Sequence, residues 1–234
     1  MKFGIVIFPG SNCDHDCQHV VSNVLKQPVE LLWHKDTDLK NCDALIVPGG
    51  FSYGDYLRCG AIAARSPIMQ SVKDFADKGG LVFGICNGFQ ILVEAGLLPG
   101  VLMRNASLNF ICKDIYLRAE HQQSPYTANL KAGEVLRVPI AHMEGNYFVD
   151  PRTLRKMETS NMIAFRYCDA DGEVSEHKNP NGALANVAGV LNEQGNVCGM
   201  MPHPERCSEA LLGNKDGLKI FESMLQWWTK KYEK

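Results

Sequence analysis

The chain has 234 residues, of which 45% are hydrophobic and 21% charged, and this composition is that of an ordinary globular protein with a single domain over 1–234. Its formal net charge of -2 and its lack of long charged runs exclude an electrostatic case for binding nucleic acid or an anionic membrane. Nine scattered cysteines predict free thiols in a cytoplasmic protein, and the apolar N-terminus stops at Pro9, too early for a signal peptide.

Short aliphatic runs alternate with longer amphipathic stretches in the first part of the chain. The runs suit strands of a buried parallel sheet, and the stretches between them suit crossover helices. We expect strands at 3–8, 29–34, 44–47 and 81–85, and helices at 14–25 and 68–78. This alternation predicts an α/β fold with a central, mainly parallel sheet flanked by helices. Ligands of such sheets bind outside the carboxyl ends of the strands.

A sharp turn at Cys86 separates the last of these strands from an amphipathic segment. Gly84 and Gly88 lie two residues to either side, where a tight strand-to-helix turn has no room for side chains. We expect an exposed sulfur at a helix N-terminus, where backbone N–H groups and the helix dipole favour the thiolate. A buried structural cysteine has equal weight on the local pattern alone, but the two glycines favour a nucleophile.

The second half of the chain changes character. Between residues 103 and 199, short apolar runs are divided by clusters of Gly, Asn and Pro. Such runs predict antiparallel strands and hairpins added to the first sheet. Residues 216–231 have helical periodicity and charged ends, which predicts a C-terminal helix packed on the sheet.

Two histidines each precede a glutamate by two residues: His142 with Glu144, and His203 with Glu205. In an extended segment, residues i and i+2 point the same way, so either pair could place a carboxylate beside an imidazole. Prolines on both sides of His203 disfavour a helix and predict an extended conformation over 201–205. We therefore predict that His203 is the catalytic base and that Glu205 orients it. The other pair lies either in a substrate-binding loop or on an ordinary surface.

Backbone N–H groups near the cysteine could stabilise an oxyanion. Gly50, in the Pro-Gly-Gly turn after the third strand, could offer one N–H group, and Asn87, directly after the cysteine, could offer a second. The simpler alternative for the glycine turn is a structural one, because such turns are common.

One dense group of potential metal ligands stands out in the sequence: Cys13, His15, Cys17 and His19. These residues share a predicted helix, and no second cysteine pair or carboxylate set completes a zinc site. We interpret the group as a chance cluster and expect no metal. The chain also lacks the Walker and dinucleotide-binding patterns.

Several segments together resemble a known family. GICNGFQ, from Gly84 to Gln90, resembles the G-x-C-x-G-x-Q nucleophile motif of class I (triad) glutamine amidotransferases, and His203-Pro204-Glu205 matches their H-P-E motif. Further segments resemble the glutaminase subunits of phosphoribosylformylglycinamidine synthases within that family: PGGFSYGDYLR from Pro48, RNAS from Arg104, HMEGNY from His142, NPNG from Asn179 and GMMPHPER from Gly199. The similarity covers nearly the whole chain, and this order of motifs is highly specific.

The resemblance implies a flavodoxin-like fold and a glutaminase mechanism. The thiolate of Cys86 would attack the side-chain amide of glutamine, and the N–H groups of Gly50 and Asn87 would hold the oxyanion. His203, oriented by Glu205, would protonate the leaving ammonia and then activate water to hydrolyse the thioester.

The resemblance also implies substrate contacts and partners. Gln90 would help to seat glutamine, and His142 and Glu144 would contact it. Ammonia would pass to a synthetase subunit of the PurL type, which uses ATP and Mg²⁺, and this chain itself would need no cofactor. A small accessory subunit of the PurS type would complete a complex for purine biosynthesis. A stand-alone cysteine hydrolase of related architecture and a non-catalytic binding module are the open alternatives.

Overall fold

The computed structural model describes residues 1–232. Its strands are β1 (Phe3–Ile7), β2 (Val29–Trp33), β3 (Ala44–Val47), β4 (Leu81–Ile85), β5 (Val101–Met103), β6 (Ile111–Ala119), β7 (Val135–His142), β8 (Asn146–Phe148), β9 (Ile163–Cys168), β10 (Val187–Leu191) and β11 (Val197–Met200). Its α-helices are α1 (Asp14–His19), α2 (Pro67–Asp77), α3 (Asn87–Glu94), α4 (Pro151–Thr159) and α5 (Leu218–Tyr232). The shorter helices are η1 (Val20–Val24), a π-helix, and the 3₁₀ turns η2 (Ser52–Asp55), η3 (Ala63–Arg65), η4 (Glu176–Lys178), η5 (Leu184–Asn186), η6 (Pro204–Cys207) and η7 (Ala210–Leu212).

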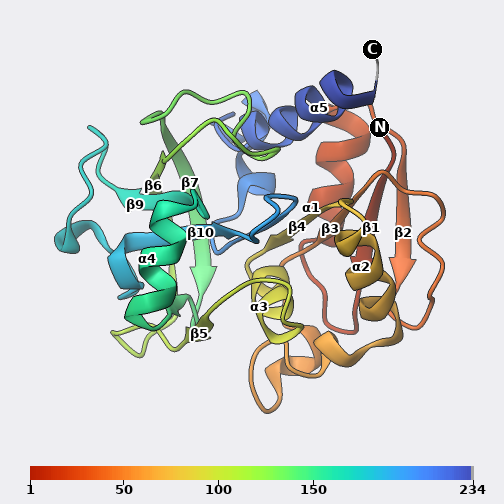
Figure 1. The fold of residues 1–234 in the computed structure, drawn as a ribbon, viewed down its shortest axis with the longest axis horizontal. Helices are drawn as coiled ribbons and strands as arrows, with labels where there is room; N and C mark the ends of the chain where they lie inside the picture. Colours follow the sequence, from red (N-terminus) through yellow and green to blue (C-terminus); the bar gives the residue numbers. More distant parts are fainter. Residues whose placement is uncertain (233–234) are drawn as a thin grey trace.

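A nine-stranded sheet in the order β2-β1-β3-β4-β11-β10-β9-β6-β7 runs through residues 1–232 (Figure 1). From β2 to β11 the neighbouring strands pair in parallel, and from β11 to β7 they pair antiparallel. β5 and β8 form a separate antiparallel pair. The predicted α/β fold, with a parallel sheet extended by antiparallel strands in the C-terminal half, is confirmed.

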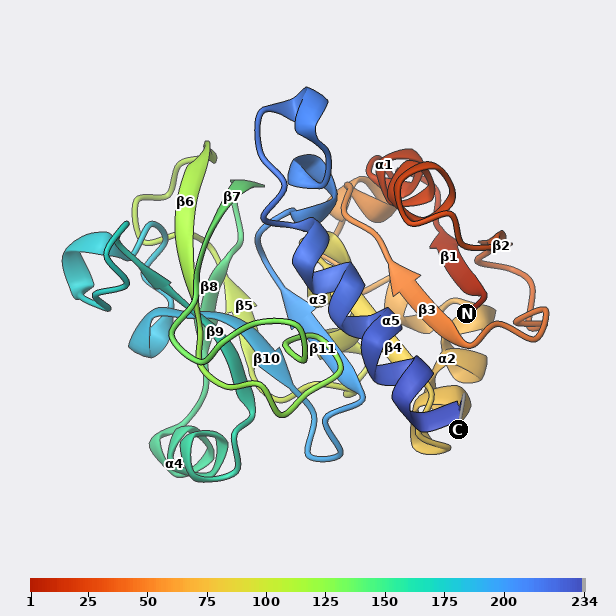
Figure 2. The same ribbon diagram turned by 90° about the horizontal axis from the view of Figure 1, so that it is seen from above.

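Helices cover both faces of the parallel half. The chain moves outward from β1 to β2 through α1, and in the opposite direction from β3 to β4 through α2, so right-handed crossovers place these two helices on opposite faces. α5 joins α1 on one face, and α3 joins α2 on the other (Figures 1 and 2). Every residue of β3, β4 and β11 is buried, which explains their continuous apolar sequences.

Three local predictions differ from the structure. The helix predicted over 14–25 leaves α-helical geometry after His19 and continues as the π-helix η1. The predicted antiparallel region contains α4, a helix that we did not predict. The sequence signals its start, because Asp150 accepts hydrogen bonds from two backbone N–H groups and a proline follows it. β11 pairs antiparallel with β10, as predicted, but its other neighbour is β4, with which it pairs in parallel; its apolar run fits a strand covered on both faces. No helix within the described residues has both the length and the apolar character to cross a membrane.

Candidate active site

The carboxyl ends of the parallel strands bring the predicted catalytic residues to one edge of the sheet, as expected for this kind of fold. Gly50 comes after β3, Cys86 directly after β4, and His203 shortly after β11. All three line a pocket of about 220 Å³. The remaining lining residues come from the loops after β1 and β3, from the antiparallel half and from η6: Asn12, Cys13, Phe51, Phe110, Ala141 and Arg206.

Cys86 forms the predicted turn between β4 and α3. Its φ of 50° and ψ of −107° are strained for a residue with a side chain. The turn is held because the Cys86 N–H donates to the carbonyl of Met200 at 2.8 Å. The predicted exposure is wrong: Cys86 is 5% exposed, since the end of β7 covers it and the Ala141 carbonyl lies 3.7 Å from Sγ. The sulfur is therefore buried beside the pocket.

Gly84 and Gly88 have the role that their spacing predicts. A Cβ atom on Gly84 would lie 2.8 Å from the Gly88 carbonyl oxygen, and one on Gly88 would lie 1.8 Å from the carbonyl oxygen of Val47 in β3. Both close contacts involve backbone, which cannot move aside as a flexible side chain can. The glycines therefore let α3 start directly against the sheet.

We expect Gly88→Ala to lower the free energy of unfolding by about 3 kcal/mol or more, because the new methyl group must push α3 away from β3. Denaturant titration measures this change. Gly79→Ala is the matched control: Gly79 has a φ of 84° but nothing within 4 Å of its Cβ position, so the loss should be only about 1–2 kcal/mol. Equal losses for the two variants would contradict the packing explanation.

His203 and Glu205 form the predicted pair. His203 Nδ1 lies 2.6 Å from Glu205 Oε1, and both residues are buried. Burial lowers the pKa of His203, but the charges of Glu205 and Cys86 outweigh it and raise that pKa well above its ordinary value. With Nδ1 bound to the carboxylate, Nε2 is the ring atom left for chemistry. It has no hydrogen-bond partner among the described residues.

The extended conformation predicted over 201–205 is only partly correct. Pro204 starts η6, because proline is well suited to the first position of a helical turn, where no N–H donor is needed. His203 itself remains non-helical, with φ −105° and ψ 84°. The turn still places Glu205 beside the imidazole.

The two predicted oxyanion donors lie on adjoining elements. Gly50 has a φ of 153°, and a Cβ atom there would lie 2.7 Å from the backbone nitrogen of Asn12, so only glycine fits. Asn87 is the first residue of α3, where the N–H group has no carbonyl within the helix to bind. The Asn87 side chain also accepts a hydrogen bond from the Ser52 N–H at 3.1 Å, which ties the glycine turn to α3.

Gln90 is buried, and its amide is already engaged. Its Nε2 donates to the Glu144 carbonyl at 2.8 Å, and its Oε1 accepts from Asn87 Nδ2 at 2.9 Å. The side chain thus connects α3 to the segment after β7.

His142 and Glu144 do not form a pair. His142 Nδ1 lies 3.1 Å from Asn105 Oδ1, whereas the Glu144 carboxylate lies 3.9 Å from Arg104 Nε. Burial and the charge of His203 lower the pKa of His142 to about 4, so His142 is neutral near pH 7. It therefore resembles neither a surface histidine nor a base with its own carboxylate.

The cysteine and histidine cluster near the N-terminus separates in the folded chain. Cys17 is buried in the core, whereas His19 is on the surface. Cys13 enters the active site: its Sγ lies 3.8 Å from His203 Nδ1 and accepts a hydrogen bond from Arg206 Nη2 at 3.1 Å. Within residues 1–232, one set of side chains has the spacing of three potential metal ligands, Cys13, His203 and Glu205. The guanidinium of Arg206 already supplies a positive charge there. Sequence reasoning missed both Cys13 and Arg206 as site residues.

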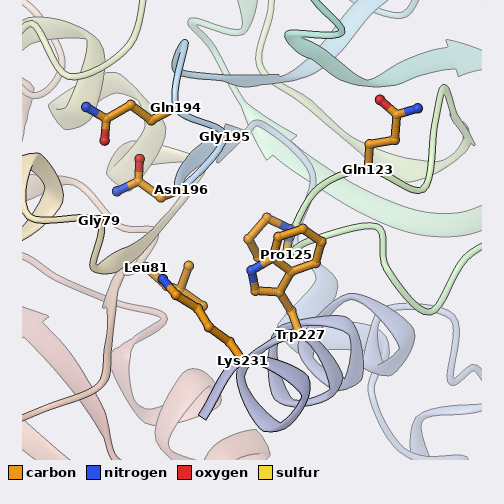
Figure 3. Close-up of a pocket in the computed structure, with 9 residues that line it drawn as sticks. All are labelled: Gly79, Leu81, Gln123, Pro125, Gln194, Gly195, Asn196, Trp227 and Lys231. Atoms are coloured by element: carbon orange, nitrogen blue, oxygen red, sulfur yellow. The ribbon is translucent and has the colours of Figure 1, made fainter.

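A second pocket, of about 180 Å³, lies where β4 and β11 begin (Figure 3). Leu81, Asn196 and Trp227 are among its lining residues. The Asn196 amide is occupied, since it donates to the carbonyls of Ala76 and Gly80 at 2.8 Å each. Because β4 and β11 are parallel, this pocket is at the opposite edge of the sheet from Cys86. We therefore assign the chemistry to the pocket that contains Cys86.

Comparison with known proteins agrees with this geometry. Residues 1–228 match the model of the CobB/CobQ-like glutamine amidotransferase domain. The chain belongs to this glutamine amidotransferase family. It is 60% identical over 225 residues to the phosphoribosylformylglycinamidine synthase subunit PurQ of Koribacter versatilis, with 96% of this chain and 97% of that protein covered. The PurQ subunit of Aquifex aeolicus is 54% identical over 225 residues, with 96% and 99% covered.

A solved structure supports the same assignment. A chain in the structure of PurLQS from Thermotoga maritima has a TM-score of 0.85 and 41% identity, with 97% of this amidotransferase and 98% of that chain covered. The resemblance read from the motifs is therefore confirmed, and this glutamine amidotransferase is of the PurQ type. The roles of individual site residues stay predictions.

Proposed function

We propose that this glutamine amidotransferase is the glutaminase subunit of a phosphoribosylformylglycinamidine synthase and supplies ammonia for purine biosynthesis. The observation that carries the proposal is the buried pair of His203 and Glu205, 2.6 Å apart, on the pocket that Cys86 also lines. The names of the relatives support the choice of synthase.

The first half of the proposed reaction forms a thioester. The thiolate of Cys86 attacks the side-chain amide carbon of glutamine, and the N–H groups of Gly50 and Asn87 stabilise the oxyanion. His203 enters as the imidazolium, which its raised pKa favours, and gives its proton to the departing amide nitrogen. The C–N bond breaks, and ammonia leaves a γ-glutamyl thioester on Cys86.

The second half restores the enzyme. His203, now neutral, takes a proton from water, and the resulting hydroxide attacks the thioester carbon. The C–S bond breaks, and glutamate leaves. The proton that His203 took from water makes it an imidazolium again, so the ion pair with the Cys86 thiolate is restored. Glu205 stabilises the imidazolium in both halves. Substrate contact by His142 and Glu144 is also part of the proposal, and Gln90 contributes by fixing the segment that contains them.

Assembly completes the proposed function. The ammonia would be used by a synthetase subunit of the PurL type with ATP and Mg²⁺, and a PurS-type subunit would join the complex, as the composition of the PurLQS neighbour supports. We propose a cytoplasmic location, which suits nine cysteines that are all free thiols. We also treat the chain as one amidotransferase domain, because its nine-stranded sheet includes strands from both halves.

Assembly should increase glutaminase turnover by about 5- to 150-fold, the range typical of coupling between sites. Steady-state glutamate release would be measured for this chain alone, for the complex with its synthetase and accessory subunits, and for the complex with substrate and nucleotide. A stand-alone hydrolase would give the same high turnover in all three samples. That result would contradict the subunit proposal.

A further inference from the structure

The segment 141–145, which comprises the end of β7 and the turn that leads to β8, touches two parts of the active site. The Ala141 carbonyl lies 3.7 Å from Cys86 Sγ, and the Glu144 carbonyl accepts a hydrogen bond from Gln90 Nε2 at 2.8 Å. The position of this segment therefore determines what borders the nucleophile. None of the catalytic residues explains how the segment keeps its shape.

Asn105 holds this segment through its side-chain amide. Its side chain is completely buried, and both ends of its amide are fully used. Nδ2 donates to the carbonyls of His142 and Asn109, at 2.9 Å each. Oδ1 lies 3.1 Å from His142 Nδ1 and accepts from the Gly145 N–H at 3.0 Å. One amide thus binds both ends of the 142–145 turn.

The same amide determines the tautomer of His142. An amide oxygen only accepts hydrogen bonds, so His142 must carry its proton on Nδ1. Nε2 is left as a bare acceptor, buried and without a partner among the described residues. Gly145 makes room for the ring, since a Cβ atom there would lie 2.3 Å from His142 Cε1.

Asn181 provides a second support for the turn. Its side-chain Nδ2 donates to the Gly145 carbonyl at 2.8 Å, and its backbone carbonyl accepts from the Ala106 N–H at 2.9 Å. The RNAS, HMEGNY and NPNG motifs, far apart in the sequence, therefore meet at Gly145. This convergence gives the three motifs a common structural role.

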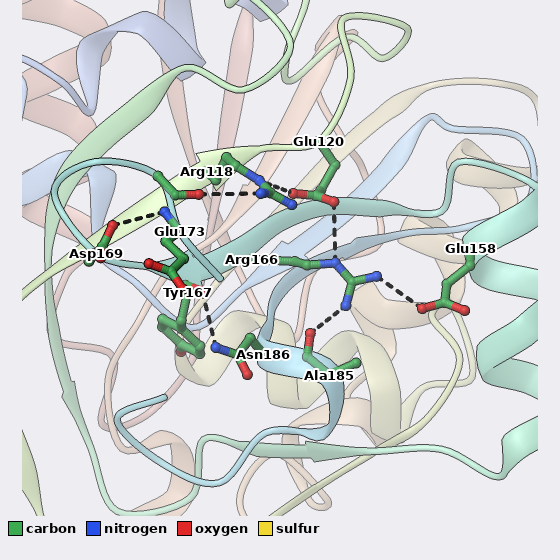
Figure 4. Close-up of polar contacts among 10 residues, drawn as sticks. Arg118, Glu120, Glu158, Arg166, Tyr167, Asp169, Glu173, Ala185 and Asn186 are labelled. Atoms are coloured by element: carbon green, nitrogen blue, oxygen red, sulfur yellow. Dashed lines mark hydrogen bonds and ion pairs between the residues drawn. The ribbon is translucent and has the colours of Figure 1, made fainter. Parts of the chain in front are cut away.

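The loop that presents Asn181 is fixed to β9 (Figure 4). Arg166 in β9 donates to the Ala185 carbonyl and pairs with Glu120 and Glu158 at 3.2 Å each. Asn186 donates to the Tyr167 carbonyl, also at 3.2 Å. The support for the turn thus extends into the antiparallel half of the sheet.

We infer that Asn105 is a positioning residue of the glutamine site: its amide holds His142 and Gly145 so that segment 141–145 borders Cys86 in the shape that accepts glutamine. This inference rests on the proposed function, since it names a residue that shapes the same site. Asn105 acts through the segment and does not itself line the pocket.

Asn105→Ala in the assembled complex should raise the KM for glutamine by about 100-fold, the scale expected when a group near the reaction moves by an ångström. Synthesis from added ammonia should stay at the wild-type rate. Labelling of Cys86 by diazo-oxo-norleucine, a glutamine-like electrophile, should slow in proportion to the rise in KM. Alkylation by iodoacetamide, which needs no glutamine site, should not slow.

Asn105→Asp separates positioning from general stability. It keeps the volume and the acceptor for His142 and Gly145 but loses the donor to the carbonyls of His142 and Asn109, so the KM defect at alkaline pH should be smaller than in Asn105→Ala but not absent. His203 is the charged group that acts on His142 in the wild type, and a carboxylate beside Nδ1 would raise the pKa of His142 from about 4. Glutamine-dependent activity should then fall at a higher pH than in the wild type as the solution is acidified. Asn109→Ala is the control, since it leaves the backbone carbonyl that Asn105 binds.

A wild-type KM and pH profile in both Asn105 variants would overturn the inference. If Asn105→Ala does not fold, the KM for glutamine and the pH profile of Asn105→Asp decide alone. A different result would contradict the proposed function, namely a wild-type complex that shows no glutaminase activity. The ratio of the two labelling rates would still test Asn105 in that case.

Discussion

Replacing Cys86 by alanine is expected to reduce glutamine-dependent synthesis by about 10⁴-fold or more, to the level of the assay background, because losing a catalytic nucleophile costs this much in comparable enzymes. Synthesis from added ammonia by the assembled complex should persist, since that reaction needs only the synthetase. Alanine tolerates the φ of 50° no worse than cysteine does, so the turn between β4 and α3 should remain. The measurement compares both nitrogen sources on the purified complex.

The control for this variant is Cys112→Ser, which changes an exposed thiol outside the pocket and should leave both activities intact. Diazo-oxo-norleucine should modify Cys86 and spare Cys112, although Cys112 is the more accessible thiol. Simultaneous loss of ammonia-dependent synthesis in Cys86→Ala would contradict the division of labour between subunits. Modification spread over several cysteines would contradict an activated nucleophile.

Much of the geometry of the candidate site was predictable because it depends on local spacing. Gly84, Cys86 and Gly88 define a turn whose steric demand can be read from three positions. The two-residue spacing of His203 and Glu205, together with the proline between them, predicts that they are neighbours, whereas the same spacing in His142 and Glu144 forms no pair. The apolar runs of β1, β3 and β4 predict the parallel sheet for the same reason. Each of these features requires only residues close together in the chain.

Other features depend on which strands become neighbours, which local spacing does not reveal. Cys13 reaches His203 across 190 residues because β1 and β11 end at the same edge of the sheet. Cys86 is buried because β7, from the antiparallel half, ends above it. Asn105 contacts His142 across 37 residues because His142 ends β7, in the same antiparallel half. The sequence pattern predicts Cys86 as the nucleophile but does not reveal what covers it.

Glu205→Gln is the second variant with a large expected effect, a loss of about 10²- to 10⁴-fold in glutamine-dependent turnover. The amide has nearly the shape of the carboxylate but no charge, so it stabilises the His203 imidazolium less well. It also presents an NH₂ group that cannot accept the Nδ1 proton, which allows the wrong ring orientation or tautomer. Glu209→Gln is the matched control, because Glu209 lies at the surface with His19.

The pH profile gives this variant a specific signature. The charge of Glu205 raises the pKa of His203, so its removal lowers that pKa. His203 must be protonated when ammonia leaves, and the alkaline decline of turnover should therefore move to lower pH. An unchanged alkaline limb would contradict the role of Glu205. The variant also removes one partner of a buried pair, so the free energy of unfolding should fall as well, and denaturant titration checks that the chain is still folded under assay conditions. Loss of turnover in a chain that remains folded would thus separate catalysis at His203 from the packing that surrounds it.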